Sequence, residues 1–151
     1  MNEQDIARQT MLENRLLQTI MEGIREALVW KTRGTDFSRK LTTLRFISQS
    51  LHRHLEHLMT LEEYDGYMDF VVARCPHLSK TVAALRQDHD RFRSGMRQLW
   101  HRLERASPAD AGTFVDVCAD MDEFLTKLEE HNKTETRLMQ EAFERTEGRE
   151  G

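Results

Sequence analysis

The chain has few of the residues that interrupt helices or crosslink small proteins. Only two prolines and seven glycines occur among 151 residues, so long uninterrupted helices are allowed. Runs of alternating Val, Ile and Thr are also missing, which argues against a β-sheet. Two cysteines are too few for a disulfide framework, and we assign neither of them a function. The composition therefore predicts an all-α protein.

Long apolar runs and a charge of one sign are absent as well. No uncharged run approaches the ~20 residues that span a bilayer, and the first residues, MNEQDIARQ, lack the basic start and apolar stretch of a signal peptide. The net charge is −4 and both signs are mixed along the chain, so no basic face for nucleic acid is expected. We expect a cytoplasmic protein, a monomer or weak homodimer, that binds neither nucleic acid nor membranes.

Four segments carry apolar residues at every third or fourth position, which is the spacing of one face of a helix. Breaks with turn-forming residues separate them, and such short connections make neighbouring helices antiparallel. The sequence thus predicts an up-down-up-down antiparallel four-helix bundle. The four helices are expected at about residues 3–31, 36–63, 78–103 and 111–145.

A short extra helical insertion is expected at residues 68–74, between the second and third helices, because Pro76 limits helix formation just before it. Asp36 or Ser38 is the expected cap of the second helix. The length fits a single domain over residues 1–146, followed by a frayed tail at residues 147–151.

The predicted fourth helix places two ionisable residues in its apolar face. His131 and Glu135 occupy positions that continue the apolar spacing from Phe114 to Ala142. A carboxylate removed from water needs a partner or a shifted pKa. The same spacing between His52 and Glu56 flanks an apolar face instead of lying in it, so we interpret that pair as surface. A metal ion or a buried polar network could satisfy the first pair.

Polar residues on the other predicted helices converge on the same region. His89 takes a core position in the third helix, and an antiparallel hairpin brings it within about one turn of His131. Glu62 continues the apolar face of the second helix. The same register places His54 opposite Asn14 of the first helix. Each helix thus turns a polar side chain inward, as bundle-core metal sites require.

Three segments resemble a known family. HLMTLEEYDGYM at residues 57–68, LRQDHDRF around His89 and HNKTETRLMQEAF at residues 131–143 are similar to the helix B, C and D signatures of hemerythrin-like, or HHE cation-binding, domains. The similarity covers most of the chain. It implies a four-helix bundle that holds a pair of non-haem irons or another metal, with roles in oxygen binding or sensing, iron sensing or storage, and resistance to oxidative or nitrosative stress.

The resemblance implies a ligand set and shows two departures from it. Leu58 and Asn14 stand where the family has histidines on the second and first helices, and leucine cannot ligate a metal. His54 and His57 are the candidate replacements. The predicted metal ligands are therefore His89, His131, Glu135, Glu62, His54 and His57.

Two functions follow from this ligand set. The first is a hemerythrin-like protein with an altered site for one or two non-haem iron ions, with zinc or manganese as alternatives, which binds dioxygen or another small diatomic ligand. The second is a metal-free bundle that acts as an interaction or regulatory module, in which Glu135 accepts hydrogen bonds from both core imidazoles. No paired nucleophile and base and no glycine-rich phosphate loop occur, so we expect no enzyme. Tyr64 and Tyr67 could line an access path to the site, but we favour their interpretation as turn residues.

Overall fold

The computed structural model describes residues 2–33, 35–64 and 66–150, and only the backbone of Thr35 and residues 144–150. Every regular element in these ranges is helical, which confirms the predicted all-α class. The long helices are α1 (Glu3–Leu28), α2 (Thr35–Glu63), α4 (Ser79–Arg105) and α5 (Ala111–Glu150). The short ones are α3 (Tyr67–Arg74), η1 (Pro76–Leu78) and η2 (Pro108–Asp110).

The helix boundaries differ from the predicted ones at several ends. The first helix ends at Leu28 instead of near residue 31, and the last extends to Glu150, beyond the expected end near Arg145. Both proposed caps of the second helix, Asp36 and Ser38, lie inside α2. The prediction of a cap was wrong there because α2 already begins at Thr35, one residue before Asp36. The side chains of the predicted tail lie outside the described residues.

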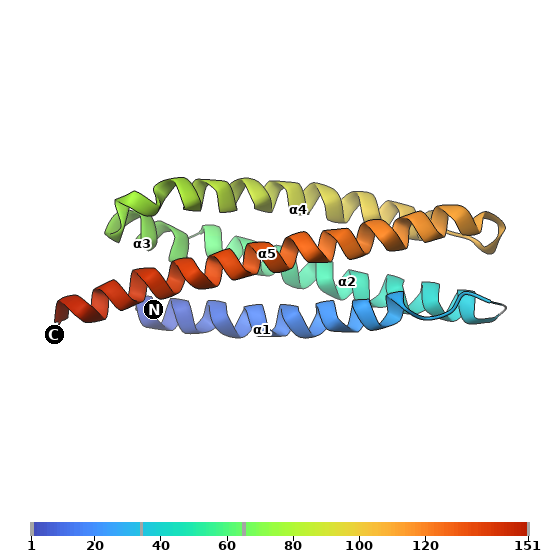
Figure 1. Cartoon of the computed structure of the whole chain (residues 1–151), viewed down its shortest axis with the longest axis horizontal. Helices are drawn as coiled ribbons and strands as arrows, with labels where there is room; N and C mark the ends of the chain where they lie inside the picture. The colour runs from blue at the N-terminus through green and yellow to red at the C-terminus, as the bar shows by residue number, and fades with distance from the viewer. Residues whose placement is uncertain (1, 34, 65, 151) are drawn as a thin grey trace.

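The four long helices run antiparallel to their neighbours in the chain and form one elongated bundle (Figure 1). The α1–α2 and α4–α5 connections lie at one end of the bundle. At the other end α3 forms the predicted insertion between α2 and α4 (Figure 1). This arrangement confirms the predicted four-helix bundle.

The buried core consists of two apolar clusters along the bundle. The larger cluster fills the half with the interhelical turns and reaches Leu58, Phe92 and Leu128. The smaller one lies beside α3 and includes Leu85 and Leu138. Along α2, α4 and α5, buried polar residues fall between the members of the two clusters. A polar layer therefore separates two apolar blocks.

Two cations of α2 bind the carboxyl ends of other helices. The buried Lys40 donates from Nζ to the carbonyl oxygens of Leu28 at 2.6 Å and Trp30 at 2.9 Å. Arg45 donates from Nε to the carbonyl oxygen of Leu103 at 2.9 Å. Helix ends leave carbonyl groups without intrahelical partners, and these side chains satisfy some of them. These contacts join α2 to α1 and α4 at the end of the bundle that carries the interhelical connections.

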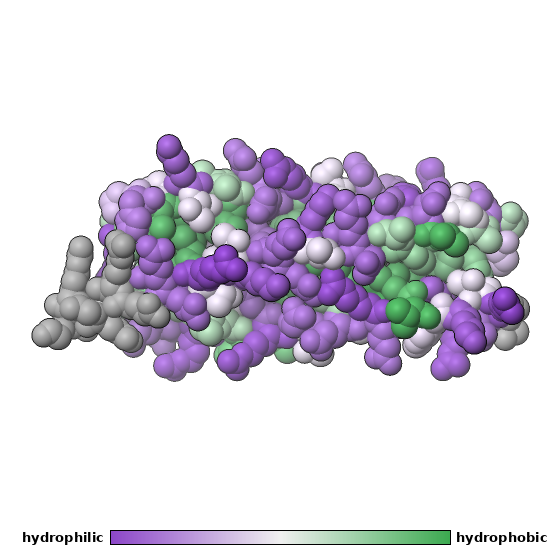
Figure 2. Space-filling view, in the orientation of Figure 1, coloured by the Kyte–Doolittle hydropathy of each residue, from purple (hydrophilic) through white to green (hydrophobic). Residues whose placement is uncertain are grey.

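The surface is mostly hydrophilic on the face shown in Figure 2. Hydrophobic residues are most evident there toward the end with the interhelical connections. Within the described residues, no helix is both long enough and apolar enough to cross a membrane.

Candidate metal centre

Four buried side chains meet in the polar layer: Glu62 of α2, His89 of α4, and His131 and Glu135 of α5. Each offers one nitrogen or oxygen atom, and these atoms all lie within 4.8 Å of one another. None of the four residues is more than 5% exposed. The structure thus brings together four of the six residues that the sequence analysis proposed as ligands.

Both imidazoles direct Nε2 toward the carboxylates. His131 Nε2 lies 2.6 Å from Oε1 of Glu135, and His89 Nε2 lies 3.5 Å from the same oxygen. His89 Nε2 is also 3.2 Å from Oε2 of Glu62. The centres of the two imidazole rings are 5.1 Å apart. Two nitrogens and two carboxylates therefore surround one small volume.

Each histidine has a second carboxylate on its other nitrogen. Nδ1 of His89 lies 2.7 Å from Oε1 of Glu63, and Nδ1 of His131 lies 2.9 Å from Oδ2 of Asp88. An Nδ1–H that donates to a carboxylate leaves Nε2 with a lone pair, the form that binds a metal. Such carboxylate–histidine pairs orient the imidazoles in many metal sites.

Glu63 is itself held by an arginine of α4. Arg93 donates to both Glu63 oxygens, at 3.2 and 3.0 Å, and also contacts Glu56 and Asp90. Burial disfavours the charged form of Glu63, but the hydrogen bonds from Arg93 and His89 outweigh it and lower its pKa. Glu63 is therefore ionised at neutral pH and accepts from His89.

The two central carboxylates have pKa values shifted in opposite directions. Burial, and next the charge of Glu135, raise the pKa of Glu62 well above its usual range. Burial also disfavours the charged form of Glu135, but the hydrogen bond from His131, and next the close approach of His89 Nε2 at 3.5 Å, outweigh this and lower its pKa to about 2. Like charges this close cannot both ionise without added positive charge. A proton or a cation can supply that charge.

Three atoms of the group make no hydrogen bond within the described part of the chain: Oε1 of Glu62, Nε2 of His89 and Oε2 of Glu135. Buried polar atoms without partners are costly and rare in native structures. Their convergence fits a cation that takes nitrogen and oxygen ligands. Iron, zinc and manganese all accept such a set.

The two other predicted ligands lie outside this group. Nε2 of His54 contacts Glu13, at 3.0 Å from its carbonyl oxygen and 3.2 Å from Oε2. His57 is exposed on the surface of α2. Leu58 is buried in the larger apolar cluster. Asn14 is half-buried, and neither polar atom of its amide has a partner in the described structure.

The interpretation of Tyr67 as a turn residue was wrong. Tyr67 is the first residue of α3 and is fully buried. Its hydroxyl makes no hydrogen bond within the described residues. Burial, followed by the charges of Glu135 and Glu62, raises the pKa of Tyr67 well above its usual range, so the phenol is neutral. Tyr64, in contrast, is exposed.

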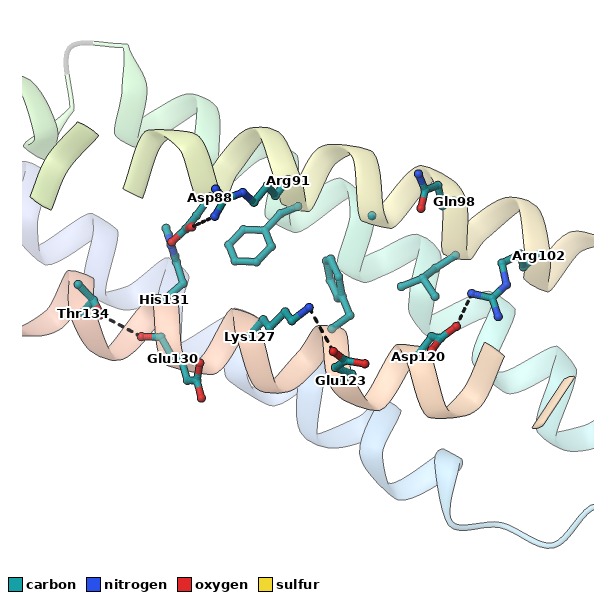
Figure 3. A pocket seen from close by; sticks show the side chains of 14 residues that line it. Asp88, Arg91, Gln98, Arg102, Asp120, Glu123, Lys127, Glu130, His131 and Thr134 are labelled. Carbon is teal, nitrogen blue, oxygen red and sulfur yellow. Dashed lines mark hydrogen bonds and ion pairs between the residues drawn. The ribbon is translucent and has the colours of Figure 1, made fainter. Parts of the chain in front are cut away.

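A groove between α4 and α5 reaches the group from solvent. It has a volume of about 620 Å³, and Asp88, Phe92 and His131 line one end of it. Figure 3 shows Asp88 and His131 pointing toward each other there. The side chain of Asp88 is 32% exposed, whereas that of His131 is 4% exposed. The imidazole of His131 and its carboxylate partner thus form the side of the group nearest solvent.

Comparison with known proteins gives one match. A family model described as the hemerythrin HHE cation binding domain matches residues 5–143. That range includes the four residues of the buried group. No curated protein and no solved structure matches the chain.

Proposed function

Because the chain belongs to the hemerythrin HHE cation-binding domain family, we propose that it binds a single non-haem iron ion. This membership confirms the resemblance found in the sequence. The proposed ligands are the four buried residues of the polar layer, Glu62, His89, His131 and Glu135. The observation that carries the proposal is their convergence within 4.8 Å while three of their polar atoms make no hydrogen bond in the described chain.

The dimensions of the group favour one ion over two. Bonds of about 2.0–2.2 Å place ligand atoms on opposite sides of an ion about 4.2 Å apart, close to the observed spread of 4.8 Å. A dinuclear site holds its ions about 3.5–4 Å apart and needs more ligands. Leu58 offers none, and His54 is engaged with Glu13.

We propose that the ion serves to bind a small ligand such as dioxygen, for sensing or storage and not for turnover. Iron with four protein ligands keeps one or two positions for small molecules. The groove between α4 and α5 brings solvent to the edge of the group at His131.

A metal-free bundle with an interaction or regulatory role is the second candidate. The pKa of His131 is raised: burial opposes protonation, but hydrogen bonds and charges of Glu135 and Asp88 outweigh it. Together with a protonated Glu62, an imidazolium could balance the group without a cation. The two candidates differ in whether the purified protein retains metal.

Metal content separates the two candidates. Untagged full-length protein, purified without chelators, is analysed by inductively coupled plasma mass spectrometry together with an absorption spectrum in air. About one iron per chain supports the mononuclear site. About two irons would overturn the proposal of a single ion. No metal after anaerobic loading with iron or zinc would leave the metal-free bundle.

A further inference from the structure

The junction between α2 and α3 places a tyrosine beside the buried group. Gly66 lies so close to the end of α2 that a Cβ on it would be 2.2 Å from the carbonyl oxygen of Leu61 and 2.5 Å from that of Glu62. Only a residue without a side chain fits there. The chain therefore begins α3 directly against the backbone of Glu62, with Tyr67 as its first residue.

Packing then holds the phenol ring of Tyr67 in place. The ring belongs to the apolar cluster beside α3, with Val71, Leu85 and Leu138 among its members. A fully buried tyrosine normally finds a partner for its hydroxyl. In the described structure that hydroxyl makes no hydrogen bond. The negative charges of Glu135 and Glu62 both act on the hydroxyl, and Glu135 is the acceptor that it approaches.

The polar layer thus receives a neutral hydrogen-bond donor from an element that supplies none of the four ligands. The ligands come from α2, α4 and α5, and the hydroxyl comes from α3. A carboxylate that binds the ion shares its negative charge with it, so it is a weaker hydrogen-bond acceptor than a free carboxylate. The Tyr67 hydroxyl can then donate to a molecule that takes an open position on the ion instead of to Glu135.

We propose that the Tyr67 hydroxyl donates a hydrogen bond to a small anionic or oxygen-donor ligand held on the ion beside Glu62 and Glu135. The ligand class is small, accepts a hydrogen bond and coordinates a metal, as water, hydroxide and azide do. Tyr67 acts here as a residue that positions and selects the ligand. This inference rests on the proposed metal site.

Azide is the probe that tests the proposal. The full chain is loaded with ferric iron and titrated with azide, and the charge-transfer absorption of the bound azide gives its dissociation constant. Tyr67→Phe keeps the ring and removes the hydroxyl alone. Losing a hydrogen bond to a charged ligand weakens binding by about tenfold or more, while the four protein ligands still hold the iron.

Tyr64→Phe is the matched control, because it makes the same chemical change three residues away at a side chain that is exposed. We expect it to leave azide affinity unchanged. A second readout is the azide stretching vibration in water and in heavy water. An isotope shift in the wild type that disappears in Tyr67→Phe shows that the hydroxyl donates to the ligand.

Each other outcome has a definite meaning. Equal azide affinity in the wild type and Tyr67→Phe, with full iron in both, would overturn the role of the hydroxyl and leave the metal site intact. A visible band in the azide-free ferric protein that vanishes in Tyr67→Phe would mean direct ligation by the phenolate, which also overturns it. A wild type that retains no metal would remove the proposed function and this inference together.

Discussion

His89 and His131 face each other across α4 and α5 with their ring centres 5.1 Å apart, and each is backed by its own carboxylate. Glu63 lies behind His89 and Asp88 behind His131. The helices thus orient two imidazoles toward one point, and Nε2 of each approaches Glu135. This arrangement of two imidazoles and a carboxylate suits a cation, and the role of each residue can be tested by substitution.

His131→Ala should abolish metal retention. It removes one of the two nitrogen ligands and leaves Glu135 buried without its 2.6 Å partner. Removing one member of a buried pair costs roughly 3 kcal/mol of unfolding free energy, so urea unfolding of the metal-free protein should shift as well. His52→Ala is the control, because His52 and Glu56 have the same spacing outside the buried group. Retained metal in His131→Ala would contradict the ligand assignment.

Metal should reverse the pH dependence of stability at neutral and alkaline pH. The pKa of His131 is raised above its usual value of 6.5, so its contribution to the stability of the metal-free protein is fully present below pH 6.5. That contribution is lost as the pH rises through the folded-state pKa. The melting temperature of the chelated protein should therefore fall above pH 6.5.

The loaded protein should behave differently in the same calorimetric series. A cation takes the place of the proton on His131, and metal affinity increases with pH because the ligands must be deprotonated. The melting temperature of the loaded protein should hold or rise over the range in which the chelated protein loses stability. Identical profiles with and without chelator would argue for the metal-free bundle.

Glu63→Gln should weaken metal binding without removing a ligand. Glu63 accepts a hydrogen bond from Nδ1 of His89 and forms an ion pair with Arg93. Loss of such a partner typically lowers metal affinity 10–100-fold. Asp90→Asn is a close control, because Asp90 contacts the same arginine and is largely exposed. Competition with a chromogenic chelator measures both affinities. Equal affinities for the two variants would show that Glu63 does not orient His89.

The double variant Asn14→His and Leu58→His should raise iron from about one to about two per chain. These positions correspond to the histidines that the family resemblance predicts, and Leu58 lies one turn before Glu62 on the buried face of α2. Inductively coupled plasma mass spectrometry gives the stoichiometry, and circular dichroism confirms folding. A folded double variant with unchanged iron would show that other residues limit the site to one ion.

The sequence predicted which four polar residues converge in the core, because these residues interrupt an apolar repeat. His89, His131, Glu135 and Glu62 occupy core positions of long helices, where the 3.6-residue period places side chains reliably. Antiparallel packing with short turns then determined which residues face one another. Helical periodicity and antiparallel packing can both be inferred from the spacing of apolar residues and turns along the sequence.

The partners around the ligands could not be predicted in the same way. Glu63 and Asp88 lie off the apolar repeat, and their contacts depend on how α2, α4 and α5 are rotated. Their adjacency in sequence to Glu62 and His89 was the available signal. The turn interpretation of Tyr67 was favoured over a place near the site because its burial depends on the close approach of Gly66 to the α2 backbone, a tertiary feature. Lys40 resembles a surface lysine until its contacts with the end of α1 are seen.

The polar layer also divides the bundle along its length. One apolar block lies toward the interhelical turns and the other beside α3, and the buried polar residues between them add no apolar contacts that would join the two blocks. Local opening follows such divisions, because weakly coupled regions exchange their amide hydrogens separately. A cation bound by residues of α2, α4 and α5 would couple the unfolding of the two apolar blocks. Occupancy of the layer would then determine whether the protein unfolds as one cooperative unit or as two.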